Sequence, residues 1–412
     1  MLRLLHTADV HLGARHTDLG ERAAVLRERQ FVAFRASIDV AIAEKVDLFL
    51  VAGDLFDSNT QPRRSVERVA AELARLAAAS IRSVVIPGTH DVYDGASIYR
   101  SYDLAALAGA DVGGISGATA GGWVNVLTTD RPEVVFPSLD AIVYGRVFAT
   151  KRASVSPLAG LDARSETRAS WRIAMVHGAL AIPGRTDSDE VVFTQEEIAA
   201  TGLDYLALGH WHSALEGRAG GVTYAYPGAP EPVALDQGGA GQVLLVTLEE
   251  RGGRRVVTVE PRRVGKTIIE KFELDAGGLR TQPELIDRLA RRADPDLVLD
   301  VRLTGLFPDD LDLDIDEVER ALAPSFLRFR LRDESIPASP GGLDAPPDTV
   351  VGAFVRDMQA RIAQLEFEAG SEAAAGAGAA AAGVIPPAER LAEMREVLRL
   401  GRHLLEGREV TL

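Results

Sequence analysis

The stretch DLFLVAGDLFD, from Asp47 to Asp57, decides the fold. Its first half is an unbroken apolar run, typical of a strand that is buried on both faces of a sheet. Its second half, GDLFD, is a polar turn that follows this strand directly. The run LRLLHT, residues Leu2–Thr7, indicates an earlier strand, and residues 22–44 between the two carry apolar side chains at helical spacing. This β-α-β alternation predicts a sheet covered by helices.

The same alternation continues along the chain. Another helix and the strand SVVIP come next, and the later runs AIVYGRVF, WRIAMVHG, YLALGH, VTYAYPG and QVLLVTLEE are all strand-like. Between two of these runs, Thr194 and Glu197 have the spacing of a capping box at the start of a short helix. We therefore predict an α/β (α+β) fold for residues 1–262, a four-layer sandwich of two β-sheets flanked by helices.

A second unit and a tail follow. Residues 263–336 alternate as β-α-β-α-β and predict a small α/β domain. Residues 337–349 are rich in proline and glycine and indicate a linker. Residues 350–412 contain two amphipathic helices around an Ala/Gly-rich spacer. Two interpretations stay open: the helices pack on the preceding domain, or they form a docking site for a partner's helices.

The composition excludes several classes of protein. The net charge of −15 argues against a module that binds nucleic acid through bulk electrostatics alone. Zero cysteines exclude disulfides and thiolate metal sites, and fit a reducing cytoplasm, where we expect the protein. No apolar run reaches the ~18 residues of a membrane span, and the short N-terminal run predicts a strand, not a signal peptide. If the protein handles DNA, the contact must therefore be local, through metal ions, an arginine patch or a partner subunit.

Polar clusters follow five of the apolar runs directly. Sites in sheet-based α/β folds form at strand ends, so we expect these clusters to meet in space. Residues at alternate positions of an extended segment point to the same side, so Asp9 would lie beside His11, and His210 beside His212. The clusters contain Asp9 and His11; Asp54 and Asp57; Thr89, His90 and Asp91; His177; and His210 and His212.

Imidazole and carboxylate ligands without sulfur suit Mn²⁺, Fe²⁺ or Zn²⁺ and do not choose between them. Asp54 could bridge two ions, and two ions about 3.5–4 Å apart would clamp a phosphoryl group and generate a hydroxide nucleophile. A histidine outside the ligand set could serve as general acid. Taken singly, each cluster has a plainer explanation, such as an N-cap turn for GDLFD. We expect His6 to be structural, His16 to lie on the surface and His403 to be exposed on the tail.

The ordered motifs HTADVHLG, GDLFD, GTHD, VHG, GHWH and YPGAP resemble the calcineurin-like metallophosphoesterases, and within them the SbcD-type DNA repair exonucleases. The resemblance implies the metallophosphoesterase sandwich and Mn²⁺-dependent hydrolysis of phosphodiesters. Residues 263–336 resemble the family's capping domain, which helps shape the DNA-binding cleft. The tail lies where relatives bind the coiled-coil base of an SMC-like ATPase, and a homodimer is also implied.

The resemblance also implies a role for each residue of the clusters. His90 would be the catalytic acid, and Asp57 or Asp91 would orient it. One metal would be held by Asp9, His11, Asp54 and His212, and the other by Asp54, His177, His210 and the position of Thr89.

Thr89 departs from the family, which usually carries asparagine there. A threonine hydroxyl lies nearer the backbone than an amide oxygen and is a poorer neutral donor to a cation. Three outcomes are open: the hydroxyl binds the ion directly, a water fills the gap, or the second metal is weak. We expect the second ion to bind more weakly than the first while catalysis survives.

Three functions compete. The appended domain and tail favour a DNA nuclease, exonuclease or endonuclease, acting with an SMC-like ATPase in double-strand-break repair. The acidic charge keeps open a phosphodiesterase or phosphatase of nucleotides, and Thr89 keeps open a scaffold subunit with a weakened metal site. The helix with Val66 to Leu76 is a candidate dimer face, unless its apolar stripe faces the sheet. Five arginines near predicted loops could contact phosphate or simply be solvated: Arg15, Arg63, Arg64, Arg100 and Arg146.

Overall fold

The computed structural model divides the chain into two compact units, Met1–Ile269 and Glu270–Leu412. The domain boundaries expected after residues 262, 336 and 349 stay predictions, and each unit is described by itself. The structure describes residues 1–412 apart from 17–22, 110–120, 154, 183–185, 187–190, 234–238, 308–310, 312, 338–345, 347, 375–389, 392, 395–396, 399–400, 402–404 and 406–412.

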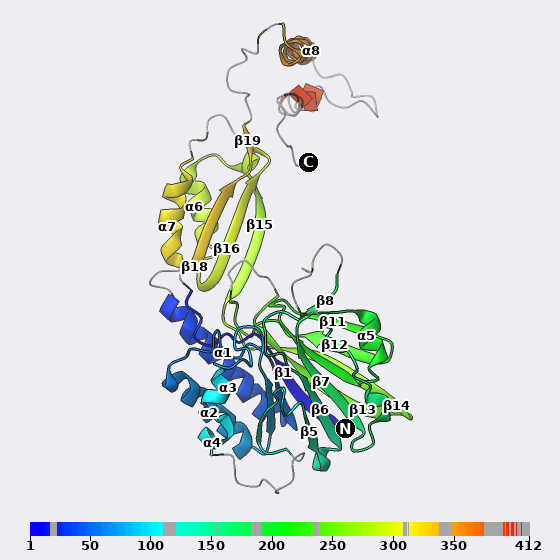
Figure 1. The fold of residues 1–412 in the computed structure, drawn as a ribbon. Helices are drawn as coiled ribbons and strands as arrows, with labels where there is room; N and C mark the ends of the chain where they lie inside the picture. The colour runs from blue at the N-terminus through cyan, green and yellow to red at the C-terminus, as the bar shows by residue number, and fades with distance from the viewer. Residues whose placement is uncertain are drawn as a thin grey trace. The chain divides into compact units, whose positions relative to one another are not determined.

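Two six-stranded sheets form the first unit (Figure 1). The first sheet, in spatial order, consists of β14 (Arg254–Arg263), β13 (Gln242–Arg251), β1 (Leu2–Thr7), β2 (Leu48–Ala52), β3 (Arg82–Ile86) and β4 (Val124–Val126). The second consists of β11 (Leu215–Ala219), β12 (Val222–Tyr226), β10 (Tyr205–Gly209), β7 (Trp171–His177), β6 (Ala141–Arg146) and β5 (Glu133–Phe136).

Strand β2 shows why the apolar runs are unbroken. Leu48 and Leu50 belong to the core between the two sheets, while Phe49 and Val51 belong to the core under the helices. Both faces of the strand are buried, so no polar alternation is needed. The predicted sandwich of two sheets and helices is confirmed.

Helices cover the outer faces of the sheets (Figure 1). The apolar stripe of the second long helix, Val66 to Leu76, is fully buried against the first sheet, so this stripe is not a free dimer face. Thr194 and Glu197 form the expected capping box. The helices are α1 (Ala23–Glu44), α2 (Arg63–Ala78), α3 (Ile98–Ser101), α4 (Leu104–Leu107) and α5 (Gln195–Ala200), with the short 3-10 helices η2 (Pro137–Leu139) and η3 (Ala163–Ser165) and the strand pair β8 (Ala179–Leu180) and β9 (Val192–Phe193).

The second unit contains the predicted β-α-β-α-β arrangement. Helices α6 and α7 pack on one face of a sheet with the order β15-β16-β18, and leucine and valine side chains fill the space between. The strands are β15 (Ile268–Asp275), β16 (Asp294–Thr304), β17 (Leu306–Phe307), β18 (Phe326–Asp333) and β19 (Ile336–Pro337), and the helices are η4 (Ala276–Gly278), α6 (Gln282–Ala290), α7 (Ile315–Leu322) and η5 (Ala323–Ser325).

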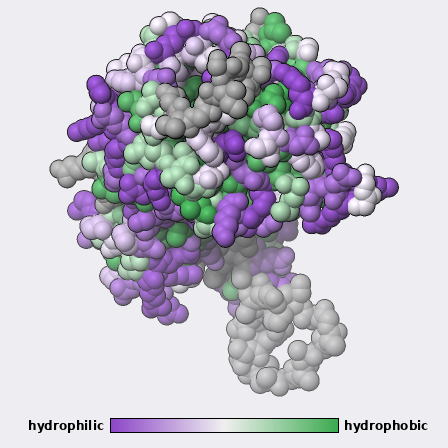
Figure 2. Space-filling view, turned by 90° about the horizontal axis from the view of Figure 1, so that it is seen from below, coloured by the Kyte–Doolittle hydropathy of each residue, from purple (hydrophilic) through white to green (hydrophobic). Residues whose placement is uncertain are grey.

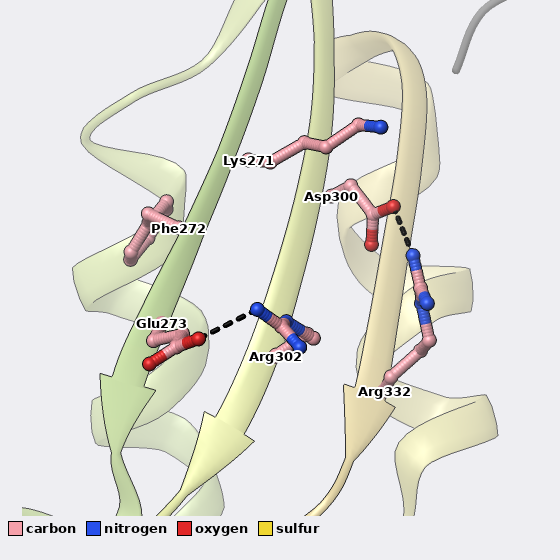
Figure 3. Close-up of a pocket in the computed structure, with 6 residues that line it drawn as sticks. All are labelled: Lys271, Phe272, Glu273, Asp300, Arg302 and Arg332. Carbon is pink, nitrogen blue, oxygen red and sulfur yellow. Dashed lines mark hydrogen bonds and ion pairs between the residues drawn. The ribbon is translucent and has the colours of Figure 1, made fainter. Parts of the chain in front are cut away.

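The other face of this sheet is charged and hollowed (Figure 3). Arg302 on β16 pairs with Glu273 on β15 at 2.6 Å, and Arg332 on β18 pairs with Asp300. Together with Lys271 and Phe272 they line a hollow of about 460 Å³.

Helix α8 (Val350–Ala374) begins the tail. Its side chains Val355 and Met358 are buried in a cluster with Leu398, so the two tail helices pack against each other. The Ala/Gly-rich spacer falls mostly in residues 375–389, and His403 likewise lies outside the described residues.

One face of the molecule is shown in Figure 2, where hydrophilic residues predominate and hydrophobic ones are scattered among them. None of the helices in the described part of the chain has the length and apolar character that crossing a membrane requires.

Candidate metal centre

Loops at the carboxyl ends of five strands carry the centre. Strands β1, β2 and β3 run parallel in the first sheet, and β7 and β10 run parallel in the second, so each sheet presents these loops at one edge. The loop residues are Asp9 and His11 after β1, Asp54 and Asp57 after β2, Thr89, His90 and Asp91 after β3, His177 at the end of β7, and His210 and His212 after β10.

The backbone of these loops is not extended. Asp9, His11, Asp54 and His210 have φ of 54°, 49°, 51° and 106°. Non-glycine residues rarely adopt such angles, which cost energy and cluster at functional sites. Asp9 and His11 do lie together, as predicted, but the predicted reason, an extended segment, is wrong. Tight turns, not the period of a strand, direct their side chains.

Asp9, His11 and His212 form a first group of ligands, with one ligand atom from each lying within 4.8 Å of the others. His11 Nε2 is 3.2 Å from His212 Nε2, and His212 Nε2 is 4.0 Å from Asp9 Oδ1. Two imidazole nitrogens that face each other can share one proton or one cation, but cannot both carry a proton without repulsion. Their arrangement fits a metal ion.

Asp9, Asp54 and His177 form a second group within the same 4.8 Å. Asp54 Oδ2 is 3.1 Å from His177 Nε2 and 3.7 Å from His11 Nε2, so this carboxylate lies between the two groups. His177 Nδ1 is 3.0 Å from the carbonyl oxygen of Ala52, which favours a proton on Nδ1 and leaves the Nε2 lone pair for a metal. Within the described part of the chain, His177 Nε2 is buried without a well-formed hydrogen bond, and a nitrogen of this kind fits a metal ligand.

Two glycines let the strands approach this closely. A Cβ atom on Gly53, where φ is +90°, would lie 2.3 Å from His177 Nδ1. A Cβ atom on Gly209 would lie 2.0 Å from the Ala52 carbonyl oxygen. Any side chain at either position would push the His177 ring away from Asp54.

His90 lies at the rim of the centre, with its side chain 48% exposed. Its Nδ1 is 3.1 Å from the carbonyl oxygen of Asp57 and 3.7 Å from the Asp57 carboxylate. The same carboxylate is 3.2 Å from His11 Nδ1. Asp57 therefore orients His90 mainly through its backbone, and its carboxylate orients His11, a candidate metal ligand.

Asp91 does not orient the His90 ring, contrary to one of the two alternatives expected. Its buried carboxylate accepts hydrogen bonds from the N–H groups of Phe56 (3.1 Å) and Gly88 (2.7 Å) and from the hydroxyl of Tyr99 (2.6 Å). Asp91 thus ties the loop of His90 to the loop of Asp54. Sequence reasoning missed Tyr99, because a lone tyrosine beyond the motif gives no signal.

Thr89 lies beside the central carboxylate. Its hydroxyl donates to Asp54 Oδ2 over 3.4 Å, while the N–H of His90 donates to Asp54 Oδ1 over 2.7 Å. The side chain is placed next to the second group of ligands, where the family would carry an asparagine.

A family model described as "Calcineurin-like phosphoesterase" matches residues 2–214. The match covers more than half of the chain and includes every residue of the centre. The chain belongs to this family. Its calcineurin-like fold and its clustered Asp and His side chains place it among phosphoesterases that use divalent metals.

Curated relatives of this phosphoesterase include DNA repair proteins. It is 30% identical to the DNA double-strand break repair protein Mre11 of Aeropyrum pernix, over 58% of this chain and 55% of that protein. It is 28% identical to Mre11 of Methanopyrus kandleri, over 68% of this chain and 55% of that protein. It is also 26% identical to the uncharacterized metallophosphoesterase YhaO of Bacillus subtilis, over 55% of this chain and 52% of that protein. The chain thus spans about half the length of the curated relatives it matches.

The phosphoesterase centre is electrostatically suited to cations. Burial alone would raise the pKa of Asp54, but nearby His177, His11 and His90 outweigh burial and lower it. Burial likewise opposes the charged form of His177, yet Asp54 and Asp9 raise its pKa to about 10. Burial, with His177 nearby, lowers the pKa of His210 to about 4, which keeps its imidazole neutral and ready to bind a metal.

The remaining histidines and arginines have other surroundings. His6 is fully buried, with Nδ1 2.9 Å from the Tyr205 hydroxyl, as expected for a structural residue. His16 is only 8% exposed, so its expected surface position is wrong. Arg146 donates to two carbonyl groups and Arg63 pairs with Glu67, so protein contacts already occupy both guanidinium groups.

Proposed function

We propose that this phosphoesterase is a metal-dependent DNA nuclease, working as the nuclease subunit of a double-strand-break repair complex. The observation that carries the proposal is the convergence of Asp9, Asp54, His177 and His212 from both sheets on one centre. Similarity to proteins named as Mre11 supports DNA as the substrate. A second unit after the phosphoesterase domain also supports a polymeric substrate, because a small ester needs no such addition.

The ligands would divide between two ions. Asp9, His11, Asp54 and His212 would hold one, and Asp54, His177, His210 and Thr89 would surround the other. When bound, divalent ions supply positive charge for the phosphoryl oxygens and lower the pKa of water. We propose Mn²⁺ as the ion, with Fe²⁺ and Zn²⁺ as alternatives that the same ligands suit.

His90 is the proposed acid. Its Nδ1 donates to the Asp57 carbonyl at 3.1 Å, which directs the opposite nitrogen, Nε2, away from this contact. In the imidazolium form, Nε2 carries the proton that the leaving 3′-oxygen needs when the phosphodiester breaks. Its half-exposed position at the rim leaves room for a nucleic-acid strand.

Thr89 would make the two ions unequal. Its hydroxyl donates to Asp54 Oδ2 over 3.4 Å, so Thr89 already has a contact with this carboxylate that would compete with a role as a metal ligand. We predict that isothermal titration with Mn²⁺ resolves one tight and one weaker site, and that T89N tightens the weaker one. The matched variant T89S keeps the hydroxyl and should behave as wild type. Two equally tight sites in the wild type would refute this asymmetry.

The tail is the proposed binding region for an SMC-like coiled-coil ATPase. Helix α8 and the following helix bury Val355, Met358 and Leu398 together, which supports a helical element of their own. Phe367 of α8 is 78% exposed and offers an apolar contact. We also propose a homodimer, although not through the buried stripe of α2.

A nucleotide phosphodiesterase is the second candidate, favoured by the net charge of −15. One assay separates the candidates: purified protein with Mn²⁺, tested on single- and double-stranded DNA and on a small phosphodiester, with and without the candidate ATPase. Cleavage of DNA supports the nuclease. Turnover of the small ester or of nucleotides without DNA cleavage supports the alternative, and failure to bind any metal supports a scaffold subunit.

A further inference from the structure

The chain leaves the first unit through residues 264–267, which have no regular secondary structure. Irregular segments at the edge of a compact unit are commonly mobile. Here the N–H groups of Val264 and Gly265 both donate to the carbonyl oxygen of Gly241 at 3.0 Å. A Cβ atom on Gly265 would lie 2.5 Å from the Pro230 carbonyl oxygen, so the segment packs closely against the loop that contains Pro230.

Glu231 holds the rest of this connector. Its carboxylate is 1% exposed and accepts the N–H groups of Lys266 at 2.8 Å and of Thr267 at 3.2 Å, together with the Thr267 hydroxyl. Arg29 on α1 donates in turn to the Thr267 hydroxyl oxygen at 3.1 Å. A buried carboxylate needs such donors, and among the described residues those of Glu231 come from two consecutive connector residues, Lys266 and Thr267.

The loop that carries Glu231 also reaches the metal centre. The N–H of Ala229 donates to the carbonyl oxygen of His212 at 3.1 Å, and the carbonyl oxygen of Ala229 accepts from the N–H of Gly241 at 2.8 Å. Gly241 is the residue that holds the start of the connector. A continuous series of hydrogen bonds, all within the first unit, therefore joins a metal-ligand residue to the exit of the chain.

We propose that Glu231 is a positioning residue for polymeric substrates: its carboxylate fixes the connector, and so fixes where the second unit is attached relative to the loop of His212. The inference rests on the proposed function, because only a substrate longer than the centre itself would need both units. Hydrolysis of a small diester needs the centre alone.

The test uses the full chain and the variant E231Q. An amide has one acceptor oxygen in place of two, so its NH₂ group must face the N–H of Lys266 or the donors of Thr267. We expect hydrogen exchange of the amides at 264–267 to quicken by about 10-fold or more, because these bonds lose their acceptor. The value of kcat/KM should fall about 5-fold or more on duplex DNA. On a small phosphodiester it should stay within about twofold of wild type, as should Mn²⁺ affinity.

Matched variants keep the test decisive. E250Q, on the exposed end of β13, should change nothing. T267V removes one donor and should show a smaller form of the E231Q effect, which T267S should restore; this pair replaces E231Q should that variant not fold. Wild-type protein that cleaves no DNA would defeat the proposed function, whatever the exchange data show. The positioning role would be overturned in two cases, provided that the wild-type protein cleaves DNA. In one, E231Q has the same kcat/KM as wild type on DNA; in the other, E231Q loses activity equally on DNA and on the small phosphodiester.

Discussion

Asp54 is the residue on which the contacts of the centre converge. One oxygen accepts the N–H of His90 at 2.7 Å, while the other lies 3.1 Å from His177 and 3.7 Å from His11. The carboxylate thus connects the β2 loop with the loops of β1, β3 and β7. A single residue with this many partners holds the candidate ligands His11 and His177 and the loop of His90 in place.

His90 can be separated from this ligand set by substitution. H90N should lower kcat on a phosphodiester by about 10²–10⁴-fold, because the leaving oxygen loses its proton donor. Mn²⁺ binding should be unchanged, because the half-exposed ring lies at the rim. Calorimetry and a cleavage assay on the same preparations check both statements, and D54N, which should lose metal and activity together, is the control. Continued cleavage by H90N would show that the acid role is wrong.

His6 should make folding stability depend on pH. Burial lowers its pKa to about 3, whereas the unfolded chain takes up the proton near the ordinary value of 6.5. Unfolding therefore binds a proton below pH 6.5, and stability falls as the pH drops from 6.5 towards 3, by at most about 1.4 kcal/mol per pH unit.

The comparison with H6Q isolates this effect, because the other titrating groups are common to both proteins. Urea unfolding at pH 7, 6 and 5 should show a stability advantage of wild type over H6Q that shrinks with falling pH. An advantage that stays constant across this range would contradict a neutral, buried His6.

Among the elements, the buried strands and the long helices were predictable and the loop geometry was not. The apolar run of β2 indicates a strand because both of its faces are covered, and the stripe from Val66 to Leu76 indicates a helix. The left-handed turns at Asp9 and Asp54 have no sequence period, because they depend on hydrogen bonds between loops. The partners of Asp91 and Asp57 could not be predicted for the same reason, since Tyr99 and His11 reach them only through the fold.

The packing of the apolar stripe of helix α2 against the sheet can be tested by substitution. Leu73 is fully buried in the core under the helices, so L73A should lower the free energy of unfolding by about 2–5 kcal/mol. Leu107 of α4 is 37% exposed, and L107A should cost less than about 1 kcal/mol. Denaturant unfolding of both variants provides the measurement. Similar small losses in both would mean that the stripe of α2 is not packed against the sheet.

Across the whole molecule, charge is distributed unevenly. The chain as a whole carries −15, yet the sheet face of the second unit opposite its helices carries a row of cations. The register of β16 and β18 places Asp300 beside Arg330 and Arg302 beside Arg332, so these four share one face. Its cations include Lys271, Arg302, Arg328, Arg330 and Arg332, and the anions beside them include Glu273, Asp300 and Glu334, which pairs with Arg302 at 3.4 Å.

This face is where we expect local contact with the DNA backbone, and Arg330 tests it best. Arg330 is exposed and has no ion pair within the described residues, so R330A removes a cation without uncovering a partner. Binding to duplex DNA should weaken. The magnitude of the slope of log K against log salt concentration should fall by about 1, as expected for the loss of one phosphate contact. R251A, which removes a surface arginine from the β13–β14 hairpin of the first unit, should leave the slope unchanged, and neither variant should affect a small phosphodiester. If R330A and R251A shift binding equally, the charge of this face has no special part in holding DNA.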